Sequence, residues 1–179
     1  MTTNKSDKPR VYVACVAACN DGKLHGEWIN AIEANEIREG IERVIKTSPE
    51  PCADEWAVHD YDGFGDAARV LGEYASAEQV AAVGALIYEH GDAAIAYLTI
   101  CDLTYELEDL DDLGRRFEDR YQGSANSEEE FAEADFRAIH EIPEALAYYI
   151  DWHKVSRDLY FRHGTHKFAN GYVFDMEAA

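Results

Sequence analysis

Carboxylates form the densest group of reactive side chains in this chain. The stretch LTYELEDLDDLGRRF, residues 103–117, holds five of them within seven residues: Glu106, Glu108, Asp109, Asp111 and Asp112. Paired carboxylates can serve general acid–base catalysis or hold a cation, but this spacing specifies neither. Like charges one helical turn apart disfavour a helix by roughly 0.2–0.5 kcal/mol per pair. A fold does not need them, so their presence indicates a function that uses the charge itself.

Two histidines near the C-terminus are the other candidates for chemistry. His163 and His166 are spaced so that they could ligate a metal with help from Cys or carboxylate side chains. This spacing is not specific, and His163 precedes Gly164, a combination typical of the last turn of a helix. The chain also lacks a glycine-rich loop that could hold a phosphate. We therefore predict no metal, no cofactor and no enzymatic activity.

The cysteines are predicted to be structural. Cys15 and Cys19 share a face with Val11 and Val13 if RVYVACVAAC, residues 10–19, is one strand, which predicts buried thiols. Redox and metal-binding roles are the alternatives. Four cysteines are too few for a dense disulfide framework in a chain of 179 residues.

The net charge of the chain is −20, from 36 Asp and Glu against 16 Lys and Arg. Acids and bases balance over residues 1–49, whereas residues 50–112 carry sixteen acids and only Arg69, and residues 113–179 carry thirteen acids and eight bases. A protein that is acidic only for solubility would spread its charge more evenly. Such a surface repels nucleic acid and anionic membranes and attracts a basic groove on another protein. A solvated face on an acidic protein is the plainer alternative.

The sequence predicts a folded protein of the cytoplasm. Its composition, 47% hydrophobic and 12% aromatic, supports packed cores and argues against a disordered acidic tail. The first ten residues are polar and do not resemble a secretion signal. The apolar-rich run at residues 79–101 is interrupted by Glu89, His90 and Asp92, so it is not predicted to span a bilayer.

The N-terminal part, residues 10–65, reads as a small α+β domain. A strand at residues 10–19, turn chemistry at Asn20-Asp21-Gly22 and a short strand at residues 24–29 predict a hairpin. Apolar residues then recur with helical spacing after Asn35, a plausible cap, and the helix ends before Pro49. EWAVHDY, residues 55–61, alternates as a third strand does.

The middle part, residues 66–121, reads as a helical domain. Ser76 to Gln79 form a capping box, and His90-Gly91 ends the helix that follows. In the acidic stretch a stripe of apolar residues predicts a helix whose remaining faces carry the carboxylates: Leu103, Leu107, Leu110, Leu113 and Phe117.

The C-terminal part, residues 122–176, reads as a second α+β domain. Residues 122–127 are predicted to be a loop, and Ser127 to Glu130 a second capping box that opens a helix. Another helix is expected from Ile142-Pro143 through Tyr149. Asp151 is expected to cap one more, with an apolar face of Trp152, Val155, Ser156 and Leu159 and an end at Gly164. Asn170-Gly171 predicts a closing hairpin between HKF and YVF.

The clustered carboxylates could imitate the phosphates of DNA. Neighbouring side chains on one helix face lie about 5–6 Å apart, a spacing that helices can repeat along a surface. At one charge per roughly 1.7 Å of duplex axis, 36 carboxylates match the charge of about 18 base pairs. Phosphate contacts carry no sequence information, so such a mimic would need no copy of the bases.

Several segments, in order along the chain, resemble the ArdA antirestriction proteins. PRVYVACVAACNDGKLHGEWI at residues 9–29 resembles the opening strand, turn and Gly-x-Trp element of that family. WAVHDYDGF at residues 56–64 has Asp62 where the family usually has Glu. IPEALAYYIDWHKVSRDL at residues 142–159 has Trp152 where the family commonly has Tyr, and GYVF follows at residues 171–174. The Cys15 and Cys19 pair matches no family feature.

The resemblance implies an elongated α+β protomer of three small domains that pairs through its C-terminal domain into a homodimer and imitates bent B-form DNA. The implied partner is the methyltransferase core of a type I restriction-modification enzyme, and nucleic acid and membranes are not expected partners. The runner-up is an acidic adaptor that binds another basic protein, such as a nuclease or a nucleoid protein. The phosphate-mimicking candidates are Asp60, Asp62, Glu73, Glu89, Asp92, Glu106, Glu108, Asp109, Asp111, Asp112, Glu118, Asp119, Glu128, Glu129 and Glu130.

Overall fold

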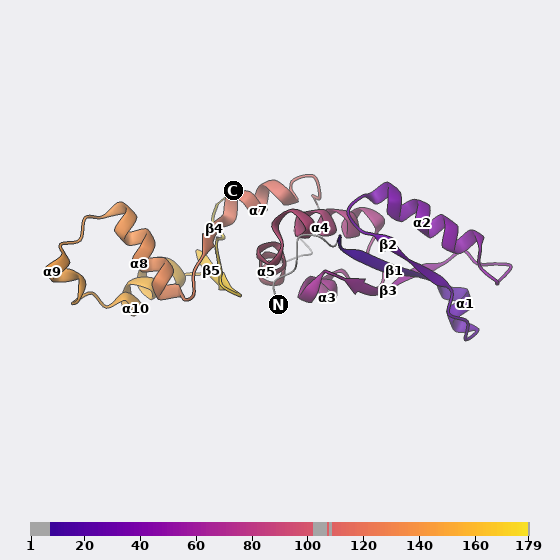
Figure 1. The fold of residues 1–179 in the computed structure, drawn as a ribbon, viewed down its shortest axis with the longest axis horizontal. Helices are drawn as coiled ribbons and strands as arrows, with labels where there is room; N and C mark the ends of the chain where they lie inside the picture. The colour runs from indigo at the N-terminus through magenta and orange to yellow at the C-terminus, as the bar shows by residue number, and fades with distance from the viewer. Residues whose placement is uncertain (1–7, 102–106, 108, 179) are drawn as a thin grey trace. The chain divides into compact units, whose positions relative to one another are not determined.

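The computed structural model describes residues 8–101, 107 and 109–178, and it is a mixed α+β structure (Figure 1). The chain divides into two compact units, Met1–Leu113 and Gly114–Ala179. Each unit contains one three-stranded antiparallel sheet. The α+β class expected from the sequence is therefore confirmed, whereas the division into three domains stays a prediction. Every helix in the described ranges is too short or too polar to reach across a bilayer.

The sheet of the first unit has the strand order β2-β1-β3. The strands are β1 (Arg10–Cys15), β2 (Gly26–Asn30) and β3 (Trp56–Asp62), and Val11 and Val13 of β1 are fully buried on one face of the sheet. The predicted third strand and the antiparallel pairing of the first two strands are confirmed, but residues 16–25 separate those two strands, so a tight turn at residues 20–22 does not join them. The pairing of β1 with β3 shifts register between Tyr12 and Val13, which marks a β-bulge.

The predicted first strand is too long. After Cys15 the chain leaves the sheet and forms a short helix, α1 (Val16–Asn20). The N–H of Val16 still bonds the Glu55 carbonyl at 3.1 Å, which extends the β1–β3 register by one residue before the helix turns away. Cys15 is buried, with its Sγ 3.3 Å from the Ser48 hydroxyl, as expected for a structural thiol. Cys19 lies on α1 and is only half-buried, so its predicted place on the strand is wrong.

Helix α2 (Ala34–Lys46) covers one face of this sheet along β1 and β2 (Figure 1). Gly40 allows the close approach, because a Cβ at this position would overlap the Cδ1 of Ile29 on β2. The other face of the sheet carries Tyr12 and Trp28.

Helices follow β3 in the order η1 (Gly65–Ala67), α3 (Ala68–Leu71), α4 (Ala77–His90) and α5 (Asp92–Ile100). The predicted capping box is confirmed: the Ser76 hydroxyl accepts from the Gln79 N–H at 3.2 Å, and the Gln79 side chain accepts from the Ser76 N–H at 3.0 Å. Gly91, at φ 59°, ends α4 as predicted. Helix α4 packs against α2 and α5 and buries Val80 and Val83.

The helix predicted across residues 103–117 is not continuous: residues 109–112 are not helical, and its last part lies in α7 (Leu113–Arg120). Residues 102–106 and 108 lie outside the described part of the chain, but residues 107 and 109–112 form turns and bends. Asp109, Asp111 and Asp112 repel one another within one turn and favour the segment before a helix over its interior. Of the predicted apolar stripe, Leu113 and Phe117 are helical and fully buried, Leu107 and Leu110 are half-buried in turns and bends, and Leu103 lies outside the described residues.

The sheet of the second unit has the order β4-β6-β5. β5 (His166–Ala169) and β6 (Tyr172–Asp175) form the predicted hairpin, with Asn170 and Gly171 at φ 50° and 88°. β4 (Tyr121–Ser124) occupies much of the loop predicted at residues 122–127, so that prediction is wrong. An edge strand can be polar throughout, and this one is anchored by Tyr121, which stacks on Phe117 with ring centroids 5.5 Å apart.

Besides α7, the second unit contains the helices α8 (Glu128–Ile139), α9 (Glu144–Ala147), α10 (Trp152–Val155) and the π-helical turn η2 (Ser156–Phe161). The predicted Asp151 cap is confirmed, since its carboxylate accepts from the Lys154 N–H at 3.1 Å. Of the predicted apolar face, Ser156 is buried as expected, but Leu159 is exposed. The wider winding of η2 turns Leu159 away from the side that an α-helix would bury. Helix α9 is one short turn in a wide loop between α8 and α10 (Figure 1).

Candidate functional site

The predicted carboxylates of β3 lie on the sheet of the first unit, across from β1. Asp62 stands opposite Arg10, and its Oδ2 accepts from the Arg10 Nη2 at 2.5 Å and Nε at 3.2 Å. Asp60 stands opposite Tyr12 and is exposed. Its Oδ1 accepts only the N–H of Tyr61, at 2.8 Å, and among the described residues it makes no ion pair. Asp60 therefore presents an unneutralised charge.

Three further candidates were expected on the central helices. Glu89, near the end of α4, is exposed, with Oε2 3.9 Å from the His90 ring, and Asp92 is the half-buried first residue of α5. Glu73 is also exposed, but its expected helical position is wrong. It lies in the turn between α3 and α4, where its carbonyl accepts the Val58 N–H at 2.9 Å. This bond fixes the turn beside β3.

The cluster that dominates the sequence is described in part. Glu106 and Glu108 lie outside the described residues. Asp109 and Asp111 are exposed and Asp112 is half-buried, all directly before the first turn of α7. Carboxylates are stabilised at this position, because the N-terminus of a helix carries a partial positive charge.

The candidates of the second unit lie on two helices. On α7, Glu118 and Asp119 are exposed, and Asp119 pairs with Arg115 at 2.7 Å. On α8, Glu128, Glu129 and Glu130 form the first turn. All three therefore share the N-terminal position that favours negative charge.

One α8 carboxylate has a shifted pKa. The His153 Nδ1 lies 2.9 Å from Glu129 Oε1, and this hydrogen bond, followed by backbone and Ser127 hydrogen bonds, lowers the pKa of Glu129. Glu129 therefore keeps its negative charge at a lower pH than an isolated glutamate does.

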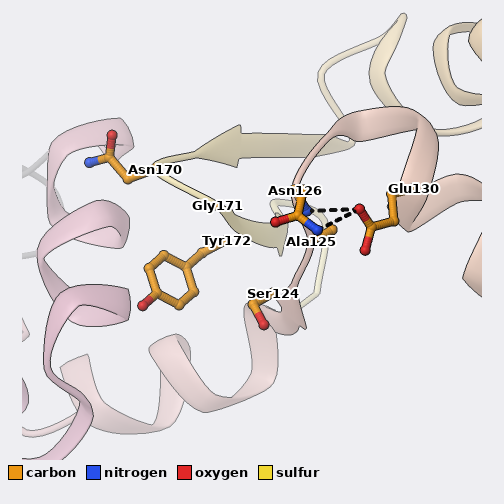
Figure 2. Close-up of a pocket in the computed structure, with 7 residues that line it drawn as sticks. All are labelled: Ser124, Ala125, Asn126, Glu130, Asn170, Gly171 and Tyr172. Atoms are coloured by element: carbon orange, nitrogen blue, oxygen red, sulfur yellow. Dashed lines mark hydrogen bonds between the residues drawn. The ribbon is translucent and has the colours of Figure 1, made fainter. Parts of the chain in front are cut away.

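Glu130 borders an open, polar hollow of about 370 Å³ in the second unit, lined by Ser124, Ala125, Asn126, Glu130, Asn170, Gly171 and Tyr172. Figure 2 shows the Glu130 carboxylate hydrogen-bonded to Asn126, whose side-chain Nδ2 donates at 2.7 Å and backbone N–H at 3.3 Å. The second capping box is thus only half formed: Ser127 Oγ accepts the Glu130 N–H at 3.1 Å, but Glu130 reaches Asn126 instead of Ser127. This contact orders the start of α8.

The structure also exposes acids that the sequence reasoning missed. The balanced charge of residues 1–49 conceals them, because four of the seven bases there are engaged in ion pairs with particular acids. These pairs are Arg10 with Asp62, Lys23 with Asp21 and Glu50, Arg38 with Glu78, and Arg43 with Glu27. Glu33, Glu39 and Glu42 are exposed and make no ion pair with a described residue. The helical spacing of Glu39 and Glu42, away from the buried Ile37 and Val44, was the signal that could have found them.

The histidines considered as metal ligands lie in different environments. His166 packs among aromatic rings, with centroids 5.4 Å from Tyr160, 5.9 Å from Phe131 and 6.1 Å from Phe161, whereas His163 is exposed. No three His, Cys, Asp or Glu side chains gather into a metal-binding arrangement in the described part of the chain.

Comparison with known proteins gives one family. A family model described as "Antirestriction protein (ArdA)" matches residues 11–174, which is most of the 179-residue chain. The match extends over both units and contains all fifteen candidate carboxylates. A search of curated proteins found no match.

Proposed function

The chain belongs to the ArdA family of antirestriction proteins, and we propose that it inhibits type I restriction-modification enzymes by occupying their DNA-binding groove with its carboxylates. Membership itself implies the antirestriction function, directed at type I restriction enzymes, and makes the protein an inhibitor and not an enzyme. The proposal adds the mechanism: the acids take the place of DNA phosphates in the methyltransferase core and compete with DNA in the cytoplasm.

The observation that carries this mechanism is the surplus of exposed, unpaired carboxylates. Asp60, Glu73, Asp111, Glu118 and Glu128 are all exposed and make no ion pair with a described residue. A groove lined by Lys and Arg that binds phosphates can pair with these groups instead. Individual contacts of exposed charges are weak, about 0–1 kcal/mol each, so the affinity must come from their number.

Because the affinity depends on the number of charge contacts, a dimer is favoured: it doubles the number of carboxylates that one enzyme can bind. The second unit carries exposed apolar side chains suited to such a contact: Ile139, Leu146, Tyr148, Tyr149 and Leu159. Tyr148 is 91% and Tyr149 80% exposed, and both follow directly after α9. Exposed large apolar side chains that lie close together, as Leu146, Tyr148 and Tyr149 do along the chain, mark interaction sites. We place the homodimer contact here, in agreement with the expected C-terminal dimerisation domain.

An acidic adaptor that binds a different basic protein uses the same charges. Family membership favours the restriction enzyme as partner, because no feature of the described surface selects a nuclease or a nucleoid protein. The two functions differ in the protein that the carboxylates bind, so they are separated by binding experiments and not by geometry.

Competition with DNA tests the proposal. The protein is added to a type I methyltransferase core bound to labelled cognate DNA, and release of the DNA is followed by fluorescence anisotropy. We expect release at a stoichiometric excess and weaker competition as salt rises, because ionic strength screens the exposed charges. Unchanged DNA binding at a large excess rejects the mechanism. A nuclease and a nucleoid protein, titrated in parallel, report on the adaptor function.

A further inference from the structure

The open face of the first sheet brings aromatic rings and acids together. Strand register places Tyr12 of β1 directly between Trp28 of β2 and Asp60 of β3, and places Arg10 opposite Asp62. The alternate residues, Val11 and Val13, point to the opposite, buried face. These five side chains, Arg10, Tyr12, Trp28, Asp60 and Asp62, are called the aromatic face below.

The two rings of the aromatic face pack against each other, and the Trp28 ring is exposed to solvent. The rings of Tyr12 and Trp28 lie 5.6 Å apart at an angle of 59°. Gly26 permits this packing, because a Cβ there would lie 2.9 Å from the Tyr12 Cζ. Trp28 nevertheless remains 43% exposed, although burial of a tryptophan is strongly favourable.

The face already binds one guanidinium. The Arg10 Cζ lies 5.4 Å from the centroid of the Trp28 ring, while its nitrogens bond Asp62. Arginine is thus held by a ring and a carboxylate together, a combination of cation–π and charge-assisted contacts. Across β1 from Trp28, Asp60 offers a second carboxylate beside Tyr12 that has no ion pair with any described cation.

We propose that the aromatic face binds an arginine side chain of the inhibited enzyme, with its guanidinium against Tyr12 and Trp28 and paired with Asp60. This inference rests on the proposed function, because the partner is the enzyme groove that otherwise binds phosphates. Charge complementarity selects the occupant: an unpaired carboxylate beside the half-buried ring of Tyr12 and the exposed ring of Trp28 suits a planar cation and repels an acidic ligand. The face would give an otherwise electrostatic interface a contact that resists salt.

Two variants whose effects on binding should depend differently on salt test the inference. Binding of the full-length protein to a type I methyltransferase core is measured at roughly 50 and 200 mM salt, a range over which charge contacts weaken strongly. Trp28→Ala should weaken binding by about tenfold or more at both concentrations, as truncated aromatic anchors do. Asp60→Asn should weaken binding at low salt, and this effect should shrink at high salt.

The control is Tyr74→Ala, which removes another aromatic ring of the first unit that is 82% exposed and should leave affinity unchanged. Far-UV circular dichroism and urea midpoints show whether each variant folds. A second readout leaves the aromatic face unchanged: Trp56→Phe and Trp152→Phe make Trp28 the single tryptophan, and the enzyme should protect it from acrylamide quenching.

The outcomes separate the two proposals. If Trp28→Ala binds as tightly as the parent at both salt concentrations, or Trp28 stays equally open to acrylamide in the complex, the inference is overturned and the inhibition mechanism stands. If the parent protein itself neither binds the enzyme nor displaces DNA, the mechanism fails and the inference fails with it.

Discussion

Tyr61 is a residue whose protonation is tied to the fold of the first unit. Its hydroxyl donates to the Gly72 carbonyl at 2.6 Å, and its ring meets Phe64 edge-on with centroids 5.0 Å apart. Burial raises the pKa of Tyr61 to about 12 from its ordinary value of 10.0. Between these values the unfolded chain has lost the proton and the folded protein retains it, so stability falls as pH rises. The stabilisation is fully present below pH ~10.

We expect Tyr61→Phe to remove this alkaline dependence. At pH ~8 the variant should be less stable by about 0.5–1.5 kcal/mol, because the hydrogen bond to Gly72 is lost. The deficit should shrink between pH ~10 and ~12 as the parent loses stability. Urea midpoints of both proteins, followed by circular dichroism, measure the difference. A deficit that stays constant across this range would show that Tyr61 does not titrate with the fold.

For single residues, the sequence predicts which carboxylates are exposed better than it predicts which of them form ion pairs. Asp60 and Asp62 were chosen alike from one short segment and both are exposed, but Arg10 neutralises only Asp62. The pair joins residues 52 positions apart, and Arg38 and Glu78 are 40 apart. Such pairs depend on strand register and helix packing, which short-range patterns do not contain. A charge count per segment therefore misses which carboxylates remain unpaired.

Helix α4 owes its position to a glycine that lies within the helix. A Cβ on Gly84 would overlap the carbonyl oxygen of Ala31, just after β2. Helix propensity alone would make Gly84→Ala stabilising by roughly 1 kcal/mol. The backbone contact reverses the sign, and we expect a loss of about 1–3 kcal/mol or more, as for an overpacked core. Urea unfolding of the variant measures it.

Gly114→Ala is the matched control for this element. Gly114 lies in α7, and a Cβ there meets nothing within 4 Å, so its substitution should be neutral or stabilising by up to about 1 kcal/mol. If both variants have the stability of the parent, or both gain, then α4 does not pack as closely on the Ala31 carbonyl as the structure indicates.

At the element scale, local signals succeed where they are self-contained. The Ser76 capping box, the Asp151 cap and the Asn170-Gly171 turn each involve only neighbouring residues, and all three were predicted. Three errors arise from longer-range causes. β4 is a strand because β6 lies beside it, β1 stops at Cys15 because its partner strand β3 begins at Trp56, and η2 packs against α8 and β5.

At the scale of the whole molecule, charge is the property that the sequence predicted most directly. The net charge of −20 and its concentration in residues 50–112 follow from composition alone, and family membership supports the function inferred from them. The family-derived dimer was also expected, but sequence did not identify its surface. Exposed apolar residues become visible only after folding, because Leu159 follows the apolar spacing of a buried face and yet lies in solvent.

We expect inhibition to depend on dimer formation through the second unit. Tyr148 and Tyr149, whose rings pack edge-on with centroids 5.6 Å apart, should lie at its centre, and replacing both with alanine should give a monomer. Inhibition should then fall by roughly 100-fold or more, since the two protomers no longer bind one enzyme together. Sedimentation equilibrium measures the assembly and DNA displacement the inhibition. Tyr74→Ala, equally exposed but in the first unit, should preserve both. A monomeric variant that inhibits as well as the parent would remove multivalency from the mechanism, and a variant that remains dimeric would move the contact elsewhere.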